Sequence, residues 1–454
     1  MSQQDKPLQI ISIDNEKNQF QLNEKLFQSV LEKIPTNMKV AIVSVVGAFR
    51  TGKSFLLDFF LRYLRLPQDN AGEVAWEQMF VSGEKLEGNV NASLKPKNTN
   101  NATTAEDKTN AAADHGDSQG GFSWRAGRDT NTTGIWIWSE PFVRKISTGE
   151  TVAVLLVDTQ GMFDQSLSQL LTTSIFGLST LLSSYQVYNV KNQIQEDQLQ
   201  HLSLFAEYGR VALQQDQNEG NSTEDSSNGN DGNDGNDDGK DRSPPPPFQT
   251  LQFLVRDWNE FEDLEPEDLN DMKGLEKSMT DYLQSVLATT ESSNDDLVSV
   301  RKHITDCFET VDAFLLPHPG FEVVKKNYDG EQNFNEWLLV CLLACMLVLL
   351  FICLLVSYVV VFLIPCILRS GDFGKIRNTF KQLMRHYVHA LFEERLQPKC
   401  IHGAYVTGEE LLTYVKAYTT VFCEAKAFPE CKTLLNAVAV SLSNELYSFH
   451  RLLF

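Results

Sequence analysis

An octapeptide near the start of the chain constrains the fold more than any other feature of the sequence. Residues 47–54 read Gly-Ala-Phe-Arg-Thr-Gly-Lys-Ser, with the spacing G-x-x-x-x-G-K-S. A mostly apolar run, Val40–Val46, precedes the octapeptide, and a helical pattern rich in Phe and Leu, Phe55–Leu64, follows it. Strand, glycine loop and helix in this order are typical of a loop whose backbone amides surround a phosphate. The sequence therefore predicts a nucleotide phosphate site.

The residues of this loop have separate chemical roles. Gly47 and Gly52 carry no Cβ, so the backbone can curl and point successive N–H groups at one phosphate, and Thr51 is expected among the binding residues. Lys53 would supply a positive charge to the β and γ phosphates, and Ser54 a hydroxyl to Mg²⁺, which prefers oxygen ligands. The following helix adds its N-terminal dipole. We therefore expect Mg²⁺ as the cofactor.

Two later segments supply further candidates for the metal and the γ-phosphate. Asp158-x-x-Gly161 follows the buried-type run Val152–Val157. An Asp at such a strand end holds Mg²⁺, directly or through water, and the Gly lets a backbone N–H approach the γ-phosphate. Thr132 or Thr133, on a loop flanked by Gly, would bring a hydroxyl to Mg²⁺ when triphosphate is bound.

A fourth segment supplies candidate residues for recognising the nucleotide base. Arg256-Asp257 follows the apolar run Leu251–Val255. A carboxylate there can accept two hydrogen bonds from guanine, from N1–H and the exocyclic amine, whereas adenine presents no such pair of donors. The pair therefore predicts selection of GTP. The usual Asn/Thr-Lys-x-Asp pattern is absent, and a surface ion pair is the alternative interpretation.

Charge and length limit the classes of function. The chain has 454 residues and a formal net charge of −21, which argues against nucleic acid as a partner of the whole chain. The eight cysteines form no C-x-x-C pair, which indicates reduced thiols. Apolar runs alternate with helical patterns, which predicts an α/β fold with a mostly parallel sheet flanked by helices. Residues 167–213 are expected to be mostly helical, and residues 97–120 and 214–247 are of low complexity.

One segment is apolar enough to cross a bilayer. Trp337–Leu368 contains no charged residue, and a span needs about 20 apolar residues. The segment would form a long tilted span or a tight hairpin, with a buried core helix as the alternative. A single span would place residues 371–454 on the far side of the membrane. A hairpin avoids this, as does a splicing or gene-model error that inserted the stretch.

Eight segments of the sequence occur together in the order of one known family. They are GAFRTGKS, GFSWR, TTGIWIWSE, VAVLLVDTQG, QVYNV, QEDQLQHLSLFAEYGR, FLVRDW and FLLPHPG. In these segments the chain resembles the atlastins, dynamin-like GTPases that fuse endoplasmic-reticulum membranes and are related to the guanylate-binding proteins. The resemblance covers nearly all of residues 8–330 apart from the low-complexity inserts and, more loosely, residues 373–454.

The resemblance implies a role for each matching position. Arg50 would be an arginine finger acting in cis on the leaving γ-phosphoryl group, and Arg125 would contact the nucleotide and the facing protomer. Thr132 would be the switch threonine that completes the Mg²⁺ shell. Phe55 would line the nucleotide site, and Val323 would lie in the loop that caps the base. The other positions keep the roles already given: Lys53 and Ser54 for phosphate and Mg²⁺, Asp158 and Gly161 for the γ-phosphate, and Arg256 and Asp257 for guanine.

The resemblance also implies an organisation and a set of partners. Residues 1–36 would form an N-terminal strand and helix, and residues 37–330 a GTPase domain with inserts at about 68–120 and 214–247. Residues 371–404 would supply the last helix of that domain, and 405–454 the start of a helical middle domain. The chain would form GTP-dependent homodimers through its GTPase domains, which face the cytosol at the endoplasmic-reticulum membrane, and would hydrolyse GTP to GDP and phosphate to tether and fuse membranes.

The sequence departs from the family pattern in two ways that affect this expectation. The apolar segment 337–368 lies earlier than the paired membrane helices of the family, and the middle domain breaks off after about one helix. The alternative function is therefore a GTP-binding interaction protein of guanylate-binding type, which dimerises but cannot complete fusion.

Overall fold

A computed structural model of the protein describes most of the segments for which the sequence predicts a folded core. The described residues are 5–14, 19–49, 51–68, 80, 121–122, 132–162, 169–220, 246–261, 264, 268–289, 295–321 and 376–423. Most of the two inserts, the apolar segment 337–368 and residues 424–454 lie outside them. Within the described ranges, none of the helices is long and apolar enough to cross a membrane.

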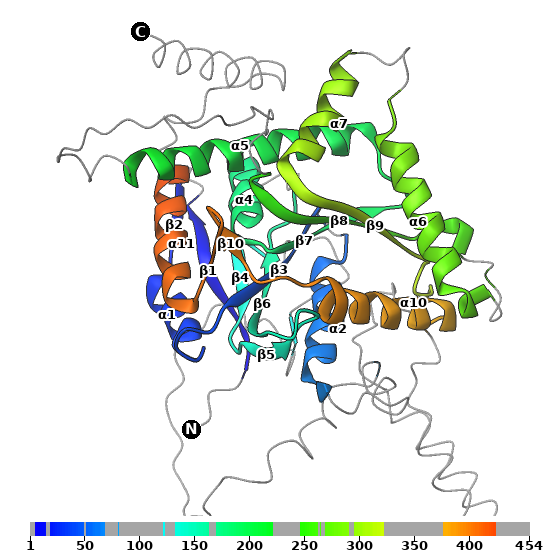
Figure 1. Ribbon diagram of the computed structural model, residues 1–454, viewed down its shortest axis with the longest axis horizontal. Helices are drawn as coiled ribbons and strands as arrows, with labels where there is room; N and C mark the ends of the chain where they lie inside the picture. The colour runs from blue at the N-terminus through cyan, green and yellow to red at the C-terminus, as the bar shows by residue number, and fades with distance from the viewer. Residues whose placement is uncertain are drawn as a thin grey trace, which may run out of the picture.

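A twisted sheet runs through the centre of the described part of the chain (Figure 1). Five strands, β6, β3, β7, β8 and β9, pair in parallel; β2, β1, β4 and β5 are antiparallel to their neighbours. This confirms the predicted α/β fold with a mostly parallel sheet. In spatial order the strands are β2 (Gln19–Leu22), β1 (Pro7–Asp14), β4 (Ile135–Trp138), β6 (Thr151–Thr159), β3 (Val40–Gly47), β7 (Tyr185–Lys191), β8 (Phe248–Arg256) and β9 (Phe308–Leu316), with β5 (Phe142–Lys145) paired to β6.

Helices cover both faces of the sheet (Figure 1). One face carries α2 (Lys53–Arg65), α10 (Asn378–His389) and the π-helical turn η7 (Ala390–Arg395). The other carries α4 (Gln169–Leu182), α5 (Glu196–Gly220) and α7 (Asp295–Cys307), and α6 (Met272–Leu287) lies beside β9. The remaining elements are α1 (Glu24–Leu31), α11 (Gly408–Cys423), the hairpin β10 (Cys400–Ile401) and β11 (Ala404–Tyr405), and 3₁₀ turns at Asn259–Phe261 and Asp268–Asn270.

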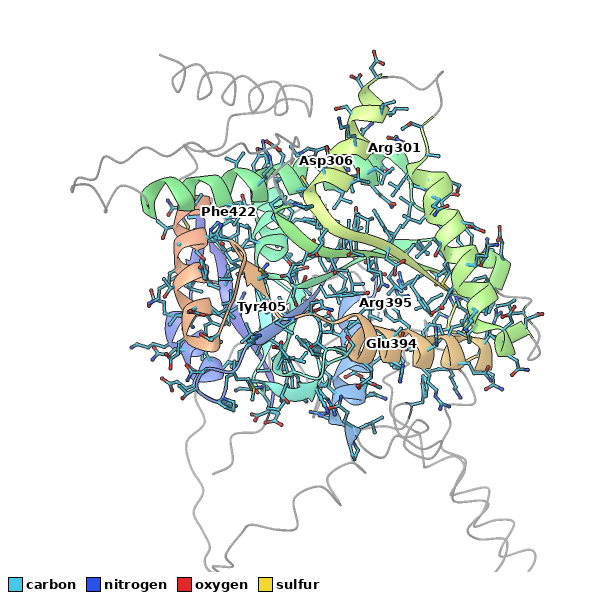
Figure 2. All side chains as sticks on the ribbon, in the orientation of Figure 1. Arg301, Asp306, Glu394, Arg395, Tyr405 and Phe422 are labelled. Carbon is cyan, nitrogen blue, oxygen red and sulfur yellow. The ribbon has the colours of Figure 1, made fainter. Side chains whose placement is uncertain are left out.

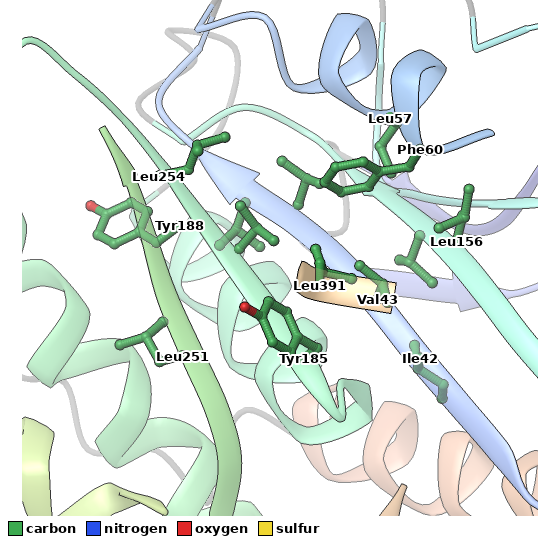
Figure 3. Close-up of a cluster of buried hydrophobic side chains, with 14 of the residues drawn as sticks. Ile42, Val43, Leu57, Phe60, Leu156, Tyr185, Tyr188, Leu251, Leu254 and Leu391 are labelled. Atoms are coloured by element: carbon green, nitrogen blue, oxygen red, sulfur yellow. The ribbon is translucent and has the colours of Figure 1, made fainter. Parts of the chain in front are cut away.

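The parallel strands read as continuous apolar runs because both of their faces are covered. Every residue of β3 is buried, and in β7 all but the last are. Figure 3 shows Leu391 of η7 in the same cluster as Val43, Tyr185, Leu57 and Phe60. One apolar core therefore joins the strands to helices from both ends of the chain.

Strand β7 departs from the expectation of mostly helix over residues 167–213, which holds for α4 and α5. The run Tyr185–Val190 is buried on both sides between β3 and β8, so it shows no alternation of apolar and polar residues. Its position at the centre of the sheet, rather than its local pattern, decides that it is a strand.

Residues 376–423 pack into the same core as the strands. The N–H of Arg377 donates to the carbonyl of Pro319 over 3.0 Å, and the ring of Phe380 lies 6.1 Å from that of Phe59 on α2. Phe422, labelled on α11 in Figure 2, lies so close to α4 that a Cβ on Gly177 would be 3.2 Å from its ring. The segment after the apolar stretch is thus part of the folded body.

An extended strap between η7 and α11 crosses the amino end of the sheet. The N–H of Lys399 donates to the carbonyl of Val40 over 2.7 Å, and the N–H of Val40 donates to the carbonyl of Val406 over 3.0 Å. The ammonium of Lys399 is buried and donates to the carbonyl of Ser183 over 2.9 Å. Burial lowers the pKa of Lys399 to about 7.

This buried lysine predicts a dependence of stability on pH. Between the folded pKa of about 7 and the ordinary value of 10.5, the unfolded chain binds the proton that the folded chain lacks. The free energy of unfolding should therefore rise with pH by up to about 1.4 kcal/mol per unit in this window. Lys399→Met should flatten that rise in urea unfolding measured from pH 7 to 10, and exposed Lys25→Met controls for a lost charge. An equal slope in Lys399→Met and the wild type would contradict the assignment.

Candidate functional site

The loop of residues 47–54 connects β3 to α2 at the carboxyl end of the parallel strands. Gly52 has a left-handed φ of 77° and immediately precedes the first turn of α2. A Cβ on Gly47 would lie 2.5 Å from the carbonyl oxygen of Asn189 on β7. Both glycines are therefore required, one by backbone conformation and the other by the close approach of a neighbouring strand.

Side chains within the loop gather at one carbonyl. The ammonium of Lys53 donates to the carbonyl of Ala48 over 3.2 Å, and the hydroxyl of Thr51 donates to the same oxygen over 2.9 Å. Lys53 is buried at the N-terminus of α2, where the helix dipole also favours an anion. The loop thus presents a positive charge and a helix N-terminus at the same point.

Three oxygen-bearing side chains from separate elements meet beside the loop. Ser54 donates to Oδ2 of Asp158 over 2.6 Å, and Thr132 donates to the same oxygen over 3.2 Å. The hydroxyls of Ser54 and Thr132 are 3.4 Å apart. The structure therefore brings together all three residues that the sequence predicts as Mg²⁺ ligands, although they lie up to 104 positions apart in the chain.

The environment of Asp158 fits a divalent cation. Its Oδ1 is buried and has no hydrogen-bond partner among the described residues. Burial raises the pKa of Asp158, and the positive charge of Lys53 and the bonds from Ser54 and Thr132 oppose that shift. A buried carboxylate oxygen without a donor, next to two hydroxyls, is a donor set that suits Mg²⁺. When bound, Mg²⁺ would be held by these residues and would neutralise charge on the phosphates.

The structure separates the two adjacent threonines that the sequence left as alternatives. Thr132 faces Asp158, whereas the hydroxyl and carbonyl of Thr133 accept from the amide of Gln9 on β1, over 3.2 and 2.8 Å. Gln160 fixes this segment: its side-chain oxygen accepts from the N–H of Gly134 over 2.7 Å, and its own N–H donates back to the carbonyl of Gly134 over 2.8 Å. The Asp158-x-x-Gly161 segment therefore holds the threonine loop in place.

Gly161 lies directly against the phosphate loop. A Cβ there would be 2.5 Å from the Cα of Phe49. The N–H of Phe49 donates to the carbonyl of Met162 over 2.9 Å, and the N–H of Met162 donates to the carbonyl of Gly47 over 3.1 Å. The loop and the Asp158-x-x-Gly161 segment are thus bonded backbone to backbone.

The predicted guanine pair lies at the end of β8, with its two side chains in different settings. Asp257 has a left-handed φ of 57°, and its Oδ2 is 3.9 Å from the exposed ammonium of Lys191. Arg256 points back under the phosphate loop: its Nε donates to the side chain of Asn189 over 2.7 Å. Arg256 is therefore bonded to the strand beside the loop, and the role of Asp257 in reading guanine stays a prediction.

Three predicted residues, Arg50, Arg125 and Val323, lie outside the described residues. Phe55 lies in the first turn of α2, with its ring 5.0 Å from that of Phe59. Asn189 is not among the residues predicted from the sequence, although an Asn flanked by Val187, Tyr188 and Val190 is a polar residue in an apolar setting that could have been noticed.

Comparison with known protein families now identifies the fold. Residues 17–338 match the guanylate-binding protein N-terminal domain. The chain belongs to this family. Membership confirms the predicted relation to the guanylate-binding proteins, and it agrees with a phosphate loop, an Asp-x-x-Gly segment and a threonine loop meeting at one sheet edge.

Individual relatives confirm the resemblance to atlastins. The chain is 33% identical to atlastin-3 of Mus musculus over 436 residues, which cover 95% of this chain and 60% of that protein. It is 32% identical to atlastin-2 of Homo sapiens over 436 residues, covering 95% of this chain and 55% of that protein. For atlastin-1 of Mus musculus the identity is 31% over 438 residues, covering 95% and 57%. The chain thus spans less than two thirds of the length of these relatives.

The separation of the two threonines predicts different responses to their removal. Thr132→Ala should raise the Mg²⁺ concentration needed for half-maximal GTP binding, by roughly tenfold for one lost ligand interaction. Thr133→Ala removes the neighbouring hydroxyl, which faces Gln9, and serves as the matched control. A Mg²⁺ titration of fluorescent GTP-analogue binding measures both. Equal shifts in the two variants would show that Thr132 has no special role.

Proposed function

We propose that this chain is a Mg²⁺-dependent GTPase that hydrolyses GTP to GDP and phosphate. The observation that carries the proposal is the cluster of Ser54, Thr132 and Asp158 beside the phosphate loop, with a buried carboxylate oxygen left for a cation. Lys53 binds the β and γ phosphates, and Gly161 senses the γ-phosphate through its backbone. No strong general base is required, because catalysis of this kind is mainly positioning and electrostatics.

The remaining residues complete the proposed site. Asp257 reads guanine by accepting from N1–H and the exocyclic amine. Phe55 lines the nucleotide, and Val323 lies in the segment that caps the base. Arg125 contacts the nucleotide and a second protomer. Arg50 acts in cis and neutralises charge as the γ-phosphoryl group leaves.

Two variants distinguish the role of Arg50 in turnover from the role of Lys53 in nucleotide binding. Arg50→Ala should lower turnover by about 10³-fold or more with little change in affinity, because the arginine acts on transition-state charge. Lys53→Ala should abolish binding, because it removes the charge that holds the ground-state phosphates. Phosphate release and equilibrium binding, measured on both, test the assignment. Unchanged turnover in Arg50→Ala would refute the finger.

We further propose that GTP drives dimerisation through the GTPase domains and that the dimer tethers and fuses endoplasmic-reticulum membranes. The similarity to atlastins over 95% of the chain supports this, as does the apolar segment 337–368. Lipid mixing between vesicles that carry the purified chain tests it. GTP hydrolysis without lipid mixing would instead indicate an interaction protein that dimerises without fusing membranes.

The packing of the described residues on either side of segment 337–368 supports a proposal for its arrangement in a membrane. Phe321 and Ile376 are the described residues on either side of the segment, and the N–H of Arg377 donates to the carbonyl of Pro319 over 3.0 Å. The guanidinium of Arg377 also lies 5.9 Å from the ring of Phe321. Residues 376–423 also pack into the core formed by the strands, so the described residues before and after the segment belong to one folded body. We propose that the segment enters and leaves the bilayer as a hairpin.

Folding can be tested on a deletion of the segment, and topology on the full-length chain. A chain without residues 337–368 should still bind GTP, because the hydrogen bond from Arg377 to Pro319 and the packing of residues 376–423 already join the two parts of the fold. It should lose membrane association in flotation assays. In sealed microsomes, protease should remove an epitope placed after residue 423 together with the GTPase domain. A protected epitope would contradict the hairpin.

A further inference from the structure

A buried asparagine joins the phosphate loop to the strand end that carries Asp257. Asn189 on β7 is only 1% exposed. Its side-chain nitrogen donates to the carbonyl of Thr51 over 2.8 Å and approaches the Thr51 hydroxyl at 3.3 Å. Its side-chain oxygen accepts from Nε of Arg256 over 2.7 Å. We call these three residues the Asn189 network.

The position of Asn189 requires a side chain that both donates and accepts a hydrogen bond. Asn189 must donate toward Thr51 and accept from Arg256, so its oxygen and nitrogen are both used. Aspartate would keep the acceptor for Arg256 and lose the donor to Thr51. Alanine would lose both.

The bond to Thr51 fixes the orientation of the peptide group between Thr51 and Gly52 in the loop. In a trans peptide the carbonyl of one residue and the N–H of the next point in opposite directions. Holding the carbonyl of Thr51 toward β7 therefore turns the N–H of Gly52 away from β7. Gly52 is left-handed at this point, with a φ of 77°, and glycine leaves such a peptide free to rotate unless it is held.

Arg256 supports the same peptide from beneath. A Cβ on Gly52 would lie 3.5 Å from the Nη1 of Arg256, so the guanidinium packs against the loop. The backbone of Arg256 is tied to the end of β7 as well, since its carbonyl accepts from the N–H of Asn192 over 2.7 Å. The side chain of Arg256 thus packs against the loop, whereas the side chain of Asp257 lies near Lys191.

We infer that Asn189 and Arg256 are positioning residues that aim the Gly52 amide at the nucleotide phosphates. The inference rests on the proposed function and assigns Arg256 to the phosphate loop rather than to guanine. Since the same amide serves GTP and GDP, the network contributes to ground-state and transition-state binding alike. Its loss should raise KM and leave kcat nearly unchanged.

Inosine triphosphate separates loop positioning from base reading, because inosine lacks the exocyclic amine of guanine. We expect three variants to lower the affinity for GTP, GDP and inosine triphosphate by about tenfold each: Asn189→Asp, Asn189→Ala and Arg256→Ala. This is the effect of losing one hydrogen bond to a charged group. The ratio of the affinities for inosine triphosphate and GTP should stay at the wild-type value in all three. In Asp257→Asn that ratio should change instead. Comparing Asn189→Ala with Asn189→Asp controls for any effect of the negative charge that aspartate adds.

A matched variant controls for general damage to β7. Gln186 is also 1% exposed on β7, and its amide oxygen accepts from Thr180 over 3.0 Å, away from the loop. Gln186→Ala should lower the melting temperature of the nucleotide-free protein about as much as Asn189→Ala, yet keep wild-type affinity for GTP.

Each failure has a separate meaning. A changed ratio of the inosine triphosphate and GTP affinities in Arg256→Ala would indicate that Arg256 reads guanine. Wild-type GTP affinity in both Asn189 variants would show that the loop keeps its conformation without Asn189. If Gln186→Ala lowers the affinity for GTP as much as Asn189→Ala does, the Asn189 network has only a structural role. If the wild-type chain binds no guanine nucleotide, the proposed function fails together with this inference.

Discussion

The close packing of β3 against β7 at the carboxyl end of the sheet is the constraint on which the site depends. Gly47 and Asn189 are register partners there, and their approach leaves no room for a Cβ on Gly47. The phosphate loop must therefore start from a fixed point, curl over β7 and enter α2. That fixed path places Ser54 at the first turn of α2, within 2.6 Å of Asp158 at the end of β6.

The opposite end of the sheet depends on a segment that comes much later in the chain. Residues 376–423 return to cover α2, cross the start of β3 through the strap at Lys399, and pack α11 against α4. Burying a lysine there is costly unless its ammonium is satisfied or neutral, and both the bond to Ser183 and the lowered pKa meet that need. The body that holds the nucleotide site is thus completed by residues on the far side of the apolar stretch.

Much of the fold is predictable from local pattern. The runs that become β3, β6, β8 and β9 are short, apolar and bounded by turn residues, and the structure has a strand at each. Strand β7 is missed because it lies between two helices and is buried on both faces, which removes the alternation that identifies a strand. Missing β7 also hides Asn189, since a side chain can be assigned to the site only after its strand is placed next to β3.

The sequence alone determined the chemistry of this site: a glycine-lysine-serine loop after an apolar strand, an Asp-x-x-Gly at another strand end, and the family these belong to. Those features are local, because each depends on a few adjacent residues and on what their side chains can bind. Only the tertiary structure decided that Thr132 rather than Thr133 faces Asp158, that Arg256 supports the loop, and that residues on both sides of segment 337–368 share one core. Those outcomes depend on which strands are neighbours and on which way each side chain turns, and neither is written in the spacing of residues along the chain.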